Sequence, residues 1–208
     1  MVGADTPLRY FCQDESRWGL LTLSGRVITL AGVKPEGIYQ WGRSTFWLYG
    51  LVEPLTGEHF FEQYDHLNSE NFEQFIHQFA ARYPDEVIVI QMDQASAHRA
   101  HEIDWPENII PLFQPAYTPE VNPIERFWKH LKTPLQWETF KNLKSLRQRV
   151  NTVLSEMTTD VIRSVTGWEF ITNAVLSAAL QSIGITSFKR RASEVSPTNL
   201  NFKHRHWY

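Results

Sequence analysis

Short apolar runs separated by turn residues predict a sheet in the first half of the chain. The run VIVIQM is apolar almost throughout, which is typical of a strand covered on both faces. The other runs are rich in β-forming residues and are bounded by Gly, Pro or short polar turns. The predicted strands are residues 8–13, 18–23, 27–30, 45–52, 59–64, 87–92 and 109–113.

Helical periodicity appears between and after these strands. Phe72, Phe75, Ile76 and Phe79 fall on one face of a helix predicted over residues 69–82, with Ser69 as its N-cap. Further helices are predicted near Ser96, after an Asn122 cap followed by Pro123, and over residues 143–157, 159–165 and 168–180. This order of elements matches a ribonuclease-H-like α/β fold, a mixed sheet flanked by helices with a helical C-terminal end.

The length of 208 residues favours one domain with one substantial core, which we place at residues 1–180. Residues 181–208 lose apolar periodicity and are basic, so they are either an arm that contacts DNA or a disordered extension. No run approaches the ~18 apolar residues of a membrane span, and the N-terminus lacks a signal pattern. A single cysteine, Cys12, suits a reducing cytoplasm, where we expect the protein.

Charge is divided unevenly along the chain. Residues 1–120 hold 7 Lys+Arg and 17 Asp+Glu, a net charge of −10, whereas residues 121–208 hold 13 and 6, a net charge of +7. An acidic part that concentrates metal ions beside a basic part that meets phosphate suits a nuclease. Solvated helix faces that happen to differ in sign would give the same split.

Three carboxylates stand at the ends of predicted elements. Asp93 follows the apolar strand, Glu125 lies in the first turn of an amphipathic helix, and Asp14 lies near the end of LRYFCQDES, directly after the strand predicted over residues 8–13. Carboxylate oxygens on separate elements can hold divalent metal for phosphodiester chemistry. Asp93 could instead be a helix cap and Glu125 could merely favour the helix dipole. Because side chains alternate across a strand, only one of Asp14 and Glu15 can face such a site, and we prefer Asp14.

Three segments, FCQDES, QMDQASAH and FQPAYTPEVNPIERFWKHLK, carry a family resemblance. In this order they resemble the catalytic domain of DDE transposases of the mariner-type superfamily, bacterial insertion-sequence branch, over about residues 10–180. The resemblance implies metal-dependent DNA cleavage and strand transfer, with Asp14, Asp93 and Glu125 as catalytic ligands of Mg²⁺, or of Mn²⁺ as a substitute. This chain departs from the family at Gln94. The family usually has Asn at this position, and the Asn side chain is one methylene shorter than that of Gln.

The same resemblance implies DNA partners, both transposon ends and target, and a homodimer. Only 13 residues precede Asp14, so we expect a helix-turn-helix reader to be encoded separately, and no membrane partner. Two other functions are compatible with these features of the sequence. One is a different nuclease on this fold, such as a junction resolvase, and the other is an inactive or domesticated remnant that binds nucleic acid or self-associates without cutting.

Five further residues are expected to support the site or contact DNA: Gln94, His98, Asn122, Arg126 and Lys129. The resemblance places His98 near the active site, whereas a zinc site with His101 lacks further ligands nearby. Lys129 lies one helical turn after Glu125, so it either steers phosphate or belongs to a solvated face. Trp128 is expected to pack in the core.

Overall fold

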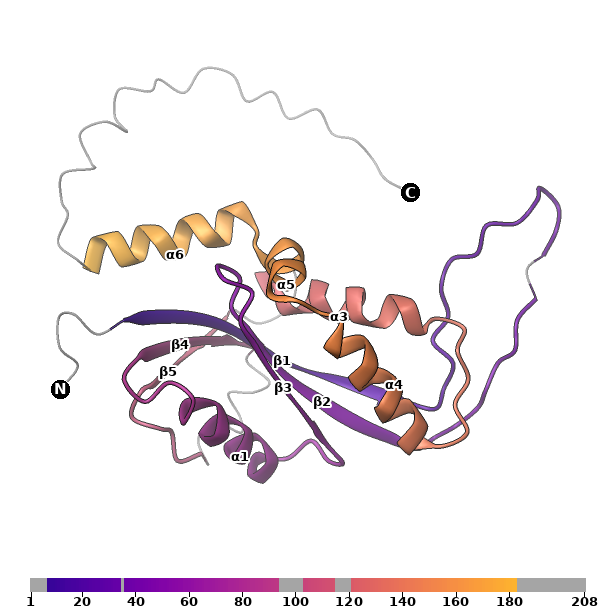
Figure 1. Cartoon of the computed structure of the whole chain (residues 1–208), viewed down its shortest axis with the longest axis horizontal. Coiled ribbons are helices and arrows are strands. Elements are labelled where there is room, and N and C mark those ends of the chain that lie inside the picture. Colours follow the sequence, from indigo (N-terminus) through magenta and orange to yellow (C-terminus); the bar gives the residue numbers. More distant parts are fainter. Residues whose placement is uncertain (1–6, 35, 94–102, 115–120, 183–208) are drawn as a thin grey trace, which may run out of the picture.

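A computed structural model describes residues 7–34, 36–93, 103–114 and 121–182. Its five strands form one mixed sheet of order β3-β2-β1-β4-β5 (Figure 1). Neighbouring strands among β1, β2 and β3 are antiparallel, while β4 runs parallel to β1 and β5 parallel to β4. The strands are β1 Leu8–Gly19, β2 Thr45–Val52, β3 His59–Tyr64, β4 Val87–Met92 and β5 Ile109–Phe113.

The prediction of two strands within residues 8–23 is wrong, because β1 runs unbroken from Leu8 to Gly19. The polar residues that suggested a turn pair with β2 instead, Asp14 opposite Gly50 and Glu15 opposite Tyr49. Their polarity therefore marks a polar stretch inside the sheet rather than a chain reversal.

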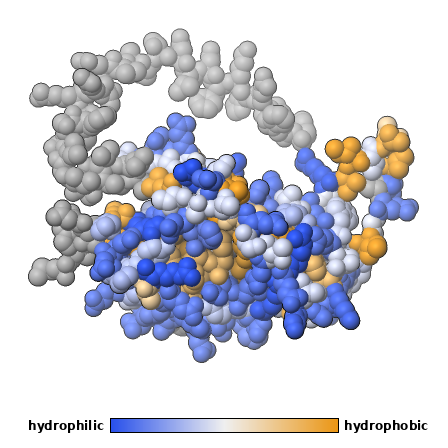
Figure 2. Space-filling model, viewed as in Figure 1, coloured by the Kyte–Doolittle hydropathy of each residue, from blue (hydrophilic) through white to orange (hydrophobic). Residues whose placement is uncertain are grey.

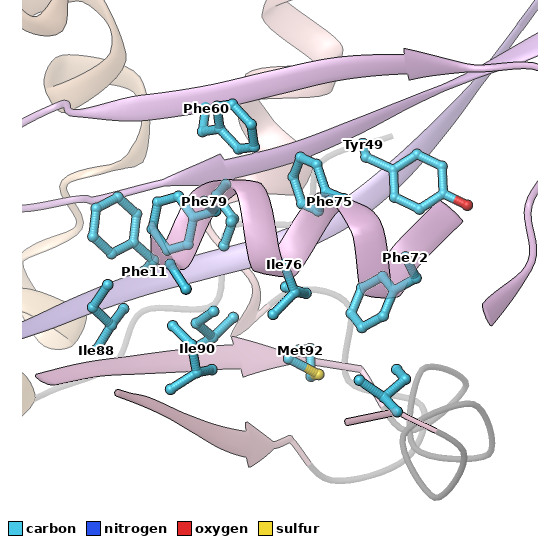
Figure 3. Packing of buried hydrophobic residues seen from close by; sticks show 14 residues of the cluster. Phe11, Tyr49, Phe60, Phe72, Phe75, Ile76, Phe79, Ile88, Ile90 and Met92 are labelled. Carbon is cyan, nitrogen blue, oxygen red and sulfur yellow. The ribbon is translucent and has the colours of Figure 1, made fainter. Parts of the chain in front are cut away.

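The helix α1, Ser69–Ala80, covers one face of the sheet and buries the apolar face expected from its periodicity (Figure 3). Its aromatic rings interlock with those of the strands, for example Phe60 stacked on Phe75 at 5.1 Å between ring centres. The N-cap residue of α1 is Asn68, which directly precedes the helix. Its side chain accepts a hydrogen bond from the Asn71 backbone N–H. The prediction of Ser69 as the cap is therefore wrong.

Helices from the second half of the chain cover the opposite face of the sheet. Residues of β1, β2 and the helices form a second buried cluster here, including Ile124, Phe127 and Leu131. The elements are α3 Ile124–Lys132, the 3₁₀ turn η2 Thr133–Leu135, α4 Leu143–Ser155, α5 Thr159–Thr166 and α6 Glu169–Ser182. Within the described residues, no helix is long and apolar enough to cross a membrane. The expected helix near Ser96 and the tail 183–208 lie outside the described residues.

Residues 20–44 form an arm that extends from the body between β1 and β2 (Figure 1). Its described part holds no strand, so the prediction for residues 27–30 is wrong: Ile28 is fully exposed and has no sheet to join. Apolar residues stand out along it in the space-filling view (Figure 2). The base of the arm is anchored, because the Gln40 side chain makes two hydrogen bonds with the backbone of Phe140.

Candidate active site

Asp14 projects from β1 toward α3. The indole Nε1–H of Trp128 donates to Asp14 Oδ2 at 2.9 Å, which fixes the face on which this carboxylate lies. Because side chains alternate along a strand, Glu15 lies on the other face. The parallel pairing of β1 with β4 ends at Cys12 and Gln91, so Asp14 and Asp93 each follow the last pair by two residues, on neighbouring segments of the chain.

Asp93 directly follows β4 and is half-buried. Glu125 occupies the first turn of α3 and is exposed. Electrostatic repulsion links Glu125 to both aspartates, since Asp14 and Glu125 interact and Asp93 and Glu125 interact. The three carboxylates thus come to one region of the molecule from the middle of β1, the end of β4 and the first turn of α3. The expectation that Asp14 stands at the end of a strand is wrong, because β1 continues to Gly19.

Asn122 fixes the start of α3 against β1. Its Nδ2 donates to the Gln13 carbonyl oxygen at 3.0 Å, one residue before Asp14, and the residue is 2% exposed. This burial suits a supporting position and leaves no surface for DNA. The N-cap position of α3 is Pro123, which has no side-chain cap hydrogen bond, but the predicted capping by Asn122 is seen in its contacts: Asn122 Oδ1 accepts the Ile124 backbone N–H at 3.4 Å.

The carboxylates sit in an environment that disfavours their charged forms. Burial raises the pKa of Asp14 well above its usual value, and repulsion from Glu15 and Glu125 adds to this, while the Trp128 N–H opposes it. Glu125 is exposed at the surface, yet the surrounding protein removes part of the water around its carboxylate, and this partial desolvation raises its pKa; Lys132 opposes the shift and Asp93 adds to it. A cation placed among these groups would favour ionisation of both.

Lys132 was not among the site residues chosen from the sequence. Burial lowers its pKa, while Glu125 and Asp14 act in the opposite direction, so the ammonium faces the acidic region. Lys132 follows Glu125 by seven residues, which is two helical turns, and this spacing could have identified it from the sequence as a residue on the same face of the helix. A cavity of about 340 Å³ is lined by both lysines of the helix together with the arm base: Leu23, Ser24, Glu125, Trp128, Lys129, Lys132 and Gln136.

The other expected site residues are only partly placed. Arg126 is exposed and its guanidinium lies 4.8 Å from the centre of the Trp168 ring, so it packs toward the start of α6. Lys129 is exposed at the cavity. Gln94, His98 and His101 lie outside the described residues. Among the residues that are described, no three His, Cys, Asp or Glu side chains are close enough to hold one ion together.

A mixed sheet of this strand order, with helices on both faces, one acid in the middle of the central strand β1 and one directly after the neighbouring strand β4, defines a ribonuclease-H-like domain. The chain belongs to the DDE superfamily endonucleases, whose family model matches residues 9–147. This confirms the expected fold class and the expected superfamily. The finer expectation of a bacterial insertion-sequence branch stays a prediction.

Solved structures of Mos1 transposase share the fold. The Mos1 strand transfer complex is 13% identical over 76% of this chain and 50% of that chain, with a TM-score of 0.59. A Mos1 paired-end complex with the left transposon end and a Mos1 mariner paired-end complex with Mn are each 13% identical, cover 76% of this chain and 51% of theirs, and have TM-scores of 0.56. The chain thus spans about half the length of these structures. No curated protein matches it in sequence.

Proposed function

We propose that this domain is the catalytic domain of a transposase that cuts DNA at transposon ends and joins the freed ends to target DNA in the cytoplasm. The observation that carries the proposal is that Asp14 lies on β1 and Asp93 directly follows the neighbouring parallel strand β4, with Glu125 on the helix whose Trp128 donates to Asp14. Membership of an endonuclease family and the Mos1 fold support it.

Divalent metal fits the donor set. Mg²⁺ prefers carboxylate oxygens and is usually held by one or two protein carboxylates together with water and substrate phosphate, so three ligands converging on one ion are not required. We propose Asp14, Asp93 and Glu125 as the ligands, with Mn²⁺ as a substitute for Mg²⁺. The raised pKa of Asp14 and of Glu125 supports this, because burial and, to a lesser extent, repulsion between carboxylates raise them, and a bound cation would favour the ionised forms. When bound, the metal activates the attacking oxygen and stabilises the leaving oxygen.

The chain's own residues orient this chemistry. Asn122 fixes α3 against β1, and the Trp128 N–H holds Asp14. Lys129 and Lys132 line the cavity beside Glu125, where they suit a DNA phosphate. Gln94, His98 and Arg126 remain proposed supporting or DNA-contacting residues. The same proposal includes a homodimer that holds two transposon ends, and a separately encoded helix-turn-helix protein that reads their sequence.

A cleavage assay on a labelled duplex tests the proposal. We expect nicking with Mg²⁺ or Mn²⁺ that is lost in Asp14→Asn, Asp93→Asn and Glu125→Gln. The matched control is Glu15→Gln, which removes an acid from the neighbouring position on the opposite face and should keep cleavage. DNA binding without cleavage by the wild-type protein, in either metal, would instead indicate an inactive remnant and refute the proposal.

A further inference from the structure

Trp128 is fully packed yet uses its one polar atom on a carboxylate. The residue is 3% exposed and its Nε1–H donates to Asp14 Oδ2 at 2.9 Å. Trp18 offers an internal comparison, because it lies 2% exposed in the same buried cluster, on the strand that carries Asp14. The Trp18 indole nitrogen is buried and has no hydrogen-bond partner among the described residues. Packing in this cluster therefore does not by itself require that an indole N–H be satisfied.

The sheet provides a place for the Trp128 indole. Gly50 lies opposite Asp14 on β2, and Phe61 lies opposite Gly50 on β3, so these residues form one row across three strands. A Cβ at Gly50 would come within 2.5 Å of Trp128 Cη2 and 2.8 Å of Cζ2. The missing side chain therefore leaves the space in which the indole lies across β2. The Phe61 ring bounds that space on the other side, 5.8 Å from Trp128 between ring centres.

We propose that Trp128 is a positioning residue that holds the Asp14 carboxylate in its metal-binding orientation, and that Gly50 is required for this contact. This rests on the proposed function, in which Asp14 binds a divalent ion. An indole N–H only donates, and the packed ring cannot turn, so Oδ2 is held in one direction. Groups that orient a metal ligand in this way commonly change metal affinity by about 10- to 100-fold when they are removed.

The test compares Mn²⁺ affinity, measured by calorimetry on the whole chain, between two matched substitutions. Trp128→Phe keeps an aromatic ring but removes the donor. Trp18→Phe makes the same change where the N–H has no partner in the described part of the chain, and it keeps a ring beneath Lys132 Nζ, which lies 5.4 Å from the centre of the Trp18 ring. We expect about 10- to 100-fold weaker Mn²⁺ binding for Trp128→Phe and wild-type affinity for Trp18→Phe, with similar losses in thermal midpoint. Gly50→Ala should also weaken binding. The two substitutions act through the same hydrogen bond, so their effects should not add. The Mn²⁺ affinity of the double variant Gly50→Ala/Trp128→Phe should equal that of whichever single variant binds Mn²⁺ more weakly.

A second readout does not depend on affinity. The protein has 8 Trp residues, and the indole N–H signal that disappears in Trp128→Phe identifies Trp128 in a ¹⁵N spectrum. We expect Mg²⁺ to shift this signal and Asp14→Asn to shift it without metal. Equal Mn²⁺ affinity of wild type and Trp128→Phe, with a Trp128 signal that Mg²⁺ leaves in place, overturns the positioning role alone. A wild-type protein that binds neither ion overturns the metal-dependent function and the positioning role together.

Discussion

Arg9 anchors the start of β1, five residues before Asp14, through a buried ion pair. Its guanidinium donates twice to the Glu53 carboxylate, whose side chain is 4% exposed, and lies 4.5 Å from the centre of the Tyr83 ring. Glu53 also accepts from the Thr56 hydroxyl, so it joins β1 to the turn after β2. Replacing Arg9 by Met keeps most of the side-chain stem and leaves the Glu53 charge buried without its cation.

The expected cost follows from that burial. Removing one partner of a buried ion pair costs about 3–5 kcal/mol, because the remaining charge is uncompensated. The Arg9 side chain keeps 15% exposure, so water partly replaces it, and we expect the lower end, about 3 kcal/mol. For a chain of this size that corresponds to a fall of about 6–12 °C in thermal midpoint. The Mn²⁺ affinity of the folded protein should not change, since Arg9 lies near the start of β1, five residues before Asp14.

Urea unfolding and thermal melts of wild type, Arg9→Met and Arg9→Met/Glu53→Gln decide the matter. The neutral amide removes the uncompensated charge, so the double variant should recover at least about 1 kcal/mol of the loss. A loss below about 1 kcal/mol for Arg9→Met would show that water screens Glu53 and that the pair is not buried in energetic terms. A double variant less stable than Arg9→Met would show that the other contacts of the Glu53 carboxylate, such as that with the Thr56 hydroxyl, outweigh the cost of its uncompensated charge.

Three further outcomes are expected. The folded-state pKa of Asp14 and of Glu125 is raised, so their contribution to stability is fully present below about pH 4 and is lost as pH rises through the folded pKa values. Thermal melts of metal-free protein at increasing pH should show this loss of stability, and added Mg²⁺ should restore the stability that is lost. Gly57→Ala should cost more than about 2 kcal/mol in unfolding free energy, since φ is +81° and the new Cβ would lie 1.8 Å from the Thr159 carbonyl oxygen. The control Gly32→Ala, at φ +83° with nothing within 4 Å, should cost only about 1 kcal/mol. Lys132→Met should reduce the salt slope of DNA binding by about 1, and an unchanged slope would exclude a phosphate contact.

Most of the fold could be predicted because local pattern and tertiary context agree. The bounds of β2, β3, β4 and β5 match those predicted from apolar runs, and the face of α1 follows its periodicity. The pattern failed where function or exposure overrides it. The polar QDES segment reads as a turn but pairs along β2, and the apolar residues of the arm read as a strand but lie exposed.

The candidate site could be predicted in its elements but not in its contacts. Alternation limits Asp14 and Glu15 to opposite faces, yet only the position of α3 decides which of them meets Trp128. The role of Gly50 depends on the register between β1 and β2, which no local pattern contains. Helical spacing placed Lys129 one turn from Glu125, but it gave no burial, and Lys132 is the more buried of the two lysines.

The choice of a tryptophan beside Asp14 follows from what the site must do. The carboxylate is raised in pKa by burial and by like charges, so it needs a donor to stay ordered when ionised. A cationic side chain in place of Trp128 would order the Asp14 carboxylate equally well. Its positive charge, however, would neutralise the negative charge that attracts a divalent ion. An indole N–H supplies the hydrogen bond and leaves the negative charge in place. The cation that is present, Lys132, interacts with both Glu125 and Asp14 but is itself disfavoured by burial, so its charge offsets the repulsion only in part. Trp128 thus gives the carboxylate a fixed direction and leaves its negative charge in place, which is what the proposed metal site requires.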